Sequence, residues 1–212
     1  MRWLSRDDIF VRSAPGFIEP CLPTPSQRVP IGPSWVYEIK HDGYRLMVRK
    51  AGERVRIYTR RGVDWTKRFP RVVRSVRKLR AQSVLLDGEG VICDDNGLAV
   101  FDKLHSKLND ESVMLYAFDM LELEGEDCRR ERLQDRKSRL RKLLGKRSDG
   151  ILYNDHMESD GQLVFEHACQ FGCEGIVAKR ADSIYRSGRS KSWLKIKNPK
   201  SPAMLRIEEG MF

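Results

Sequence analysis

The chain has 212 residues, of which 40% are hydrophobic and 33% charged, and its 40 Lys and Arg against 30 Asp and Glu give a formal net charge of +10. This size and balance predict a soluble globular protein whose core is large enough to need no disulfide or structural metal. An integral membrane protein is excluded, because no apolar run approaches the roughly 18 residues of a spanning helix.

The cysteines and histidines exclude further classes. The five cysteines form no CxxC pair and the four histidines are scattered, which argues against a disulfide scaffold, a zinc finger and a Ser-His-Asp hydrolase. Asp7 and Asp8 stand where a secretory signal needs an apolar stretch. We therefore expect reduced thiols, a cytoplasmic location and no membrane partner.

The positive charge is concentrated in three stretches, residues 49–80, 129–147 and 179–200. Together they hold 31 of the 40 basic residues but only 5 of the 30 acidic ones. A single basic run is usually a solvated helix face, but three runs favour a basic surface that binds a polyanion. Nucleic acid is the expected partner.

The elements predicted first along the chain are mainly strands. Residues 1–34 are rich in proline and are expected to form an irregular, extended lead-in, with residues 1–16 as a peripheral arm. Strands are predicted at 35–40, 44–50 and 54–59, the last two joined by a hairpin turn at residues 51–53. Residues 67–80 predict a helix with one apolar stripe and a second face that carries Arg71, Arg74 and Lys78.

The rest of the chain predicts two further helices and four strands. Buried strands are expected at 84–93 and 113–121, a basic helix at 131–144, and strands at 174–179 and 192–197. Another helix, 159–171, is expected to begin with a capping box from Ser159 to Gln162 and to end at Gly172. Strands and helices mix without regular alternation, which indicates an α+β fold with largely antiparallel sheets.

One segment, residues 38–45 (EIKHDGYR), points to chemistry. Lys40 ends an apolar strand just before an Asp-Gly turn, and a buried lysine near other cations loses its proton more easily and becomes a nucleophile. Taken alone, the segment favours a salt-bridged lysine at a hairpin turn over a nucleophile. Later segments change this balance: T-R-R-G at 59–62, D-G-E at 87–89, F-D at 118–119, E-G-I-V-A-K at 174–179 and W-L-K-I-K at 193–197.

In this order, the six motifs resemble the adenylation domain of ATP-dependent DNA ligases, within the wider family of covalent nucleotidyltransferases. The ligase domain of bacterial non-homologous end-joining proteins is the most similar group, on residues 17–20, 38–45, 64–70 and 185–197. The resemblance covers about residues 17–198 and implies an adenylation domain at 17–200. It implies two mainly antiparallel sheets flanked by helices, in an ATP-grasp-like arrangement with the nucleotide in the groove between them.

The resemblance also implies a role for each motif residue. Lys40 is expected to attack the α-phosphate of ATP and to carry AMP. The nucleotide is expected to contact Arg45, Arg60, Glu89, Phe118, which would stack on adenine, and Lys179, Lys195 and Lys197, while the backbone at Ile39, with Glu38 nearby, reads the adenine edge. Glu89 and Glu174 are the expected ligands of Mg²⁺ or Mn²⁺, a hard cation that one or two carboxylates and waters suffice to hold.

In the family, AMP then passes to a 5′-phosphate in nicked or broken double-stranded DNA, and a 3′-hydroxyl displaces it, in DNA repair and recombination close to the nucleoid. Arg71, Arg74 and Lys78 are expected to neutralise DNA phosphates. Two alternatives stay open. One is an RNA ligase or capping-type nucleotidyltransferase, and the other is a non-catalytic DNA-binding module that keeps the fold.

Family members usually continue into an OB-fold, whereas only 15 residues follow Lys197 and residues 201–212 read as a short tail. The expectation is a minimal ligase, a ligase that takes an OB-fold or an end-joining protein from another chain, or a truncated piece of a longer ligase or a relic. Because the OB-fold of the family helps to orient the pyrophosphate leaving group, its absence implies slow attachment of AMP to Lys40.

Overall fold

Two β-sheets joined through a buried core make up the computed structural model of the protein, which describes residues 16–145 and 149–208. The first sheet has the order β1-β11-β10-β2-β9, with strands β1 (Cys21–Pro25), β2 (Trp35–Ile39), β9 (His156–Met157), β10 (Gly175–Arg180) and β11 (Gly188–Lys197). The second has the order β4-β3-β5-β6-β7, with β8 beside β6, and contains β3 (Tyr44–Ala51), β4 (Arg54–Thr59), β5 (Ser83–Val91), β6 (Met114–Leu123), β7 (Glu126–Asp127) and β8 (Ile151–Tyr153).

The predicted α+β class with two mainly antiparallel sheets is confirmed. Only two pairings, β1 with β11 and β6 with β8, are parallel in the part of the chain that the structure describes. Side chains of both sheets share one cluster, in which Val36 and Trp193 of the first sheet meet Met47, Leu85 and Leu121 of the second. Because both sheets contribute to this cluster, the sequence motifs carried by one sheet lie opposite those carried by the other.

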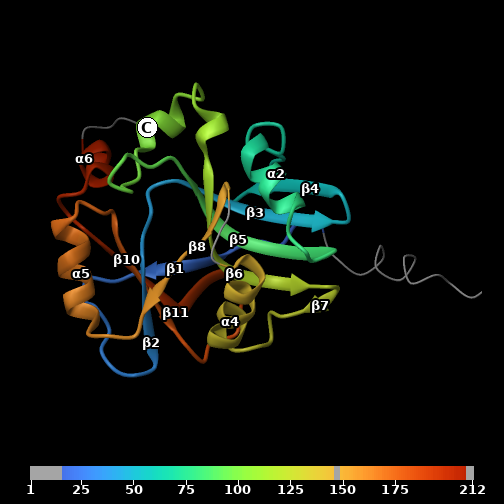
Figure 1. The fold of residues 1–212 in the computed structure, drawn as a ribbon. Coiled ribbons are helices and arrows are strands. Elements are labelled where there is room, and N and C mark those ends of the chain that lie inside the picture. The colour runs from blue at the N-terminus through green and yellow to red at the C-terminus, as the bar shows by residue number, and fades with distance from the viewer. Residues whose placement is uncertain (1–15, 146–148, 209–212) are drawn as a thin grey trace, which may run out of the picture.

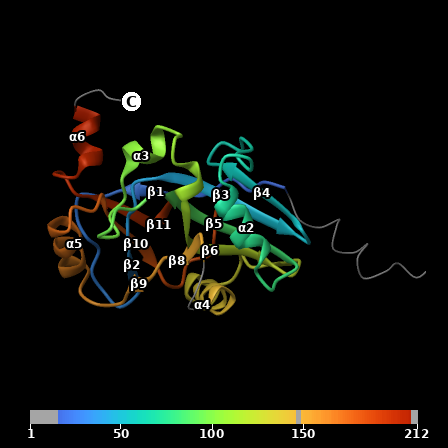
Figure 2. The same ribbon diagram turned by 45° about the horizontal axis from the view of Figure 1, so that its top comes forward.

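Helices lie along the outside of the sheets (Figure 1). α2 (Pro70–Arg77) packs near β4 and α4 (Leu133–Leu144) along β6, while α5 (Gly161–Gln170) covers β10 and β2. Short segments complete the described chain: α3 (Phe101–His105), the 3-10 turn Asp110–Ser112 and α6 (Pro202–Glu208). Figure 2 shows α6 standing away from the sheets at the end of the molecule that carries α5.

The predicted apolar stripe of the 67–80 helix is buried, although the helix is shorter. Phe69, Val72 and Val76 have no exposed surface, and the helix begins at Pro70, since proline is well suited to a first turn whose N–H groups have no partner. The hairpin of residues 44–59 also forms as predicted, with Gly52 at φ +58° in its turn.

Two sequence predictions are wrong. Residues 21–25 are not irregular, because they form β1 and pair with β11. The helix at 161–170 has no capping box from Ser159: Asp160 caps it instead, accepting from the backbone N–H groups of Gln162 and Leu163. The predicted tail contains the helix α6, which the sequence did not predict. The predicted arm lies outside the described residues apart from Gly16.

All five cysteines carry free thiols, as expected. Within residues 16–145 and 149–208, no helix is both long enough and apolar enough to span a membrane.

Candidate active site

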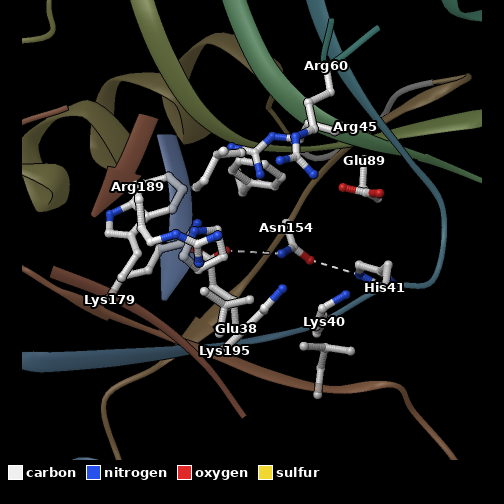
Figure 3. Close-up of a pocket in the computed structure, with 16 residues that line it drawn as sticks. Glu38, Lys40, His41, Arg45, Arg60, Glu89, Asn154, Lys179, Arg189 and Lys195 are labelled. Atoms are coloured by element: carbon white, nitrogen blue, oxygen red, sulfur yellow. Dashed lines mark hydrogen bonds and ion pairs between the residues drawn. The ribbon is translucent and has the colours of Figure 1, made fainter. Parts of the chain in front are cut away.

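A cavity of about 210 Å³ lies where the two sheets meet, and nine of the predicted residues line it (Figure 3). They are Glu38, Ile39, Lys40, Arg45, Arg60, Glu89, Phe118, Lys179 and Lys195. The first sheet contributes residues of β2, β10 and β11, and the second contributes residues of β3, β5 and β6. Motifs up to 157 residues apart in the sequence therefore form one site.

Lys40 follows the last residue of β2 and extends into this cavity. Its backbone N–H donates to the carbonyl of Gly175 at 2.9 Å, which ties the lysine to the start of β10. Its ammonium forms an ion pair with the Glu174 carboxylate, and the two side chains are 20% and 8% exposed. Figure 3 shows the ammonium ends of Lys40 and Lys195 pointing into the same space, with Glu89 across from them.

Two glycines of the motifs allow this close arrangement. A Cβ on Gly43 would lie 2.4 Å from the carbonyl oxygen of Gly90, so a side chain there would push the turn after Lys40 away from β5. Gly175 has φ +138° and a Cβ would lie 2.1 Å from the carbonyl oxygen of Ile196. The K-x-D-G and E-G motifs thus have glycine where backbone segments nearly touch.

Arg45 lies against the aromatic ring of the site. Its Nε and Nη2 bind both oxygens of Asp87 at 2.5 and 2.7 Å, and Nη2 also donates to the carbonyl of Cys21. The guanidinium carbon lies 4.4 Å from the ring centroid of Phe118. Only Nη1 of Arg45 has no partner among the described residues, so it is the atom left for a phosphate.

Glu38 and Lys179 form a buried pair behind the cavity. The Lys179 ammonium donates to Glu38 Oε2 at 2.6 Å, and both side chains are 2% exposed. It also lies 4.2 and 4.0 Å from the ring centroids of Phe118 and Trp193. Burial lowers the pKa of Lys179, with Glu38 acting in the opposite direction. Lys179 is therefore already satisfied by a carboxylate and two rings.

Glu89 is the carboxylate of the site that forms no ion pair among the described residues. Burial raises its pKa to about 7, against the attraction of Arg45 and Lys40. A carboxyl group of this kind gains by binding a cation, which favours its ionised form.

The proton of Glu89 has a consequence for stability. The ordinary pKa is 4.5 and the folded-state value is about 7, so between these pH values the folded protein holds a proton that the unfolded chain has released. Stability from this group therefore falls as pH rises through that window. We expect Glu89→Gln to raise the melting temperature relative to the wild type increasingly from pH 5 to 7, and by a constant amount above pH 8. Exposed Glu19→Gln is the control, and a pH-independent difference for Glu89→Gln would contradict the assignment.

Seven lining residues were not among the predicted site residues: Leu22, Pro23, His41, Asn154, Val177, Arg189 and Trp193. His41 is the variable residue of the K-x-D-G motif and is half-buried. It packs on Tyr116, with ring centroids 4.2 Å apart, and its Nε2 lies 3.0 Å from Asn154 Oδ1. Burial lowers the pKa of His41. Asn154 follows a three-residue strand with no motif around it, so the sequence carries no signal for it.

The remaining predicted residues lie outside the cavity. Glu174 lies beside the cavity, because its carboxylate pairs with the lining residue Lys40. Lys197 Nζ lies 3.9 Å from Glu174 Oε1. Arg71 and Arg74 on α2 are paired with Asp149 and Glu111, each at 3.0 Å. Lys78 is exposed just after α2.

The acidic groups fit a metal ion held mainly by a substrate. No cluster of three or more His, Cys, Asp or Glu side chains able to hold a metal occurs in the part of the chain that the structure describes. Glu89 and Glu174 are two carboxylates near Lys40. Magnesium binds in this manner, through one or two carboxylates and phosphate oxygens.

A family model described as "ATP dependent DNA ligase domain" matches residues 27–197. This chain belongs to that family. The multifunctional non-homologous end joining protein LigD of Pseudomonas aeruginosa is 38% identical over 187 residues, which are 86% of this chain and 22% of that protein. A DNA ligase of Thermococcus fumicolans is 33% identical over 184 residues, or 79% of this chain and 33% of that protein.

Solved structures agree with this membership of the ATP-dependent DNA ligase family. The ligase domain of M. tuberculosis LigD matches with a TM-score of 0.76 and 34% identity, over 84% of this chain and 60% of that one. A mycobacterial DNA ligase D complexed with ATP and MES matches with a TM-score of 0.75 and 31% identity, over 92% and 62%. The chain thus spans about a fifth of the length of the LigD proteins it matches and about three fifths of these solved chains.

Proposed function

We propose that this chain carries out the adenylation chemistry of a DNA ligase, with Lys40 as the nucleophile. The observation that carries the proposal is the position of Lys40: its ammonium enters the cavity between the sheets, where Arg45, Arg60 and Lys195 also point. Cations aimed at one space favour the charge that develops on a phosphate during transfer. The mycobacterial ligase D that resembles this chain was solved with ATP.

The cavity offers groups that suit a nucleoside triphosphate. Phe118 presents an aromatic face, Glu38 presents a carboxylate acceptor for an exocyclic amino group, and Ile39 offers its backbone. The buried indole N–H of Trp193 has no acceptor among the described residues, and an unmet donor of this kind costs free energy that a ligand can recover. Lys195 and Arg60 line the same cavity, and Lys197 lies nearby beside Glu174.

In the proposed reaction, Lys40 Nζ attacks the α-phosphorus of ATP, the N–P bond forms and the bond to pyrophosphate breaks. Lys40 must first lose a proton and its pairing with Glu174. Mg²⁺, which Glu89 and Glu174 would hold, supplies neutralising charge to the phosphates when bound. AMP then passes from Lys40 to a DNA 5′-phosphate and leaves when a 3′-hydroxyl attacks.

The test is intact-protein mass after incubation with ATP and Mg²⁺. We expect a gain of one AMP per chain, and no gain with GTP, whose 6-oxo group would face the Glu38 carboxylate. A gain with GTP and not ATP would favour the capping-type alternative. The absence of any gain, with DNA binding retained, would favour a non-catalytic module. Addition of a pre-adenylylated nick then separates a defect in the first step from the loss of all ligation.

Nicked or broken duplex DNA is the proposed partner, with an end-joining protein or a separate OB-fold chain as a second, in the cytoplasm close to the nucleoid. We propose α2 as a phosphate-contacting surface. Its exposed ion pairs with Asp149 and Glu111 contribute little to stability, so a phosphate can replace either carboxylate.

The α2 surface predicts a change in salt dependence. We expect the variant Arg71→Ala/Arg74→Ala/Lys78→Ala to bind nicked DNA more weakly. The negative slope of log K against log salt concentration should become less steep, by about 0.9 for each DNA phosphate that the variant no longer neutralises. Arg28→Ala/Lys103→Ala is the control, because it removes two exposed cations that lie outside the three basic stretches. An unchanged slope in the triple variant would rule out α2 as a DNA-binding surface.

A further inference from the structure

Two ammonium groups share one buried carboxylate behind the cavity. Besides Lys179, Lys137 of α4 donates to Glu38, at 2.6 Å from Oε1, and its side chain is only 1% exposed. Asn154 Nδ2 adds a bond to Oε2 at 3.3 Å. Two cations and one anion leave this cluster with an excess of positive charge. Among the described residues, no carboxylate other than Glu38 bonds to Lys137 or Lys179.

All three N–H donors of Lys137 have acceptors in the cavity wall. They are Glu38 Oε1, the carbonyl of Asn154 at 3.1 Å and the carbonyl of Phe118 at 3.5 Å. Glu38 belongs to β2 of the first sheet and Phe118 to β6 of the second. One ammonium therefore fixes the acceptor group of one wall relative to the aromatic ring of the other.

The Glu38 carboxylate keeps one acceptor position. A carboxylate offers about four such positions, and the donors of Lys137, Lys179 and Asn154 occupy three. Burial alone would raise the pKa of Glu38, but Lys137 and Lys179 outweigh it and hold the pKa below its ordinary value. The carboxylate is thus ionised and held from three sides, with room for one more donor.

We propose that Lys137 is a positioning residue for the nucleotide base, which holds the Glu38 carboxylate so that its free acceptor position meets an exocyclic amino group beside the Phe118 ring. This inference rests on the proposed function, in which Glu38 and Phe118 contact the base. It assigns to α4, which lines no part of the cavity, a share in the choice of adenine.

A second buried lysine shows what a purely structural role looks like. Lys50 is 3% exposed, and its ammonium donates to the carbonyls of Arg77 and Leu79 at 2.8 and 2.5 Å. Neither bond joins Lys50 to a residue that lines the cavity. Lys50→Met is therefore a matched control for Lys137→Met, because both variants replace a buried ammonium by an apolar side chain of similar length.

The experiment compares the binding of ATP and of purine riboside 5′-triphosphate, which lacks the 6-amino group. Dissociation constants are measured by calorimetry with EDTA present, so that no AMP is transferred. We expect Lys137→Met to weaken ATP binding by about tenfold, as for a hydrogen bond to a charged group. Binding of the analogue should change by less than about twofold. Lys50→Met should leave the ratio of the two constants unchanged, whatever it does to the melting temperature.

An unchanged ratio of the two dissociation constants in Lys137→Met, whether both nucleotides lose affinity equally or neither does, would overturn the inference. If the wild type binds ATP and the analogue equally, Glu38 does not read the amino group, and the inference fails while transfer of AMP to Lys40 still stands on the mass measurement. If the wild type binds neither nucleotide and also gains no AMP in the mass measurement with Mg²⁺, the proposed function fails with it. Lys137→Gln undergoes the same comparison with the same criteria should the methionine variant not fold.

Discussion

Replacing Lys40 by arginine should remove all covalent AMP from the protein, as detected by intact mass after incubation with ATP and Mg²⁺. The guanidinium keeps the positive charge beside Glu174 but stays protonated, so it has no lone pair with which to attack phosphorus. This variant therefore separates charge from nucleophilicity, which Lys40→Ala does not. Both variants should retain nearly all of their affinity for nicked DNA.

Lys103→Arg is the matched control for this experiment. Lys103 is an exposed lysine of α3 and lies outside the cavity, so its replacement should leave labelling at the wild-type level. If Lys40→Arg still gains the mass of one AMP, another residue is the nucleophile, and peptide mapping would locate it.

Asp119→Ala should destabilise the protein by about 3–5 kcal/mol, because it leaves a buried guanidinium without its anion. Arg136 and Asp119 both have 0% exposed side chains and are joined by two bonds of 2.7 and 2.8 Å. Arg136 also donates to the carbonyls of Glu131 and Ser183. The expected result is a large fall in the urea midpoint, with a loss of folded protein at 37 °C.

Two further variants test the reason for this loss. Asp135→Ala breaks the exposed pair with Arg132 at the start of the same helix and should change stability by less than about 1 kcal/mol. Asp119→Leu/Arg136→Met removes both buried charges together and should recover much of the stability that Asp119→Ala loses. Equal effects of Asp119→Ala and Asp135→Ala would show that burial of the pair is not what matters.

The chemistry of the motifs explains why much of the site was predictable. Acids within an apolar strand are costly unless they are paired, and Asp87 indeed binds Arg45 and the Tyr185 hydroxyl. Glycine at 43 and at 175 marks places where backbones nearly touch. Lysine after an apolar strand and arginine after the next turn define two walls of one cavity. Such signals are local, and the motif order connects them.

The missed features depend on distant partners. Cys21–Pro25 contains two prolines, which are compatible with an edge strand, and only the remote β11 makes it one. Lys137 looked like one more cation of a basic helix. A signal was nevertheless present, because the buried residues of α4 are Leu133, Arg136, Lys137, Leu140 and Leu144, at the spacing of a core-facing stripe. Charged residues at core positions of a helix predict buried ion pairs.

The order in which strands enter the two sheets has a consequence for synthesis on the ribosome. All strands of the second sheet lie between residues 44 and 153, whereas β1 of the first sheet pairs with β11, which ends at residue 197. The second sheet can thus assemble on a nascent chain before β10 and β11 have emerged, while the first waits for contacts of long sequence separation. Because β10 and β11 form one wall of the cavity, a growing polypeptide has no complete cavity until that wall is translated. AMP on Lys40 would therefore mark chains whose synthesis has passed this point.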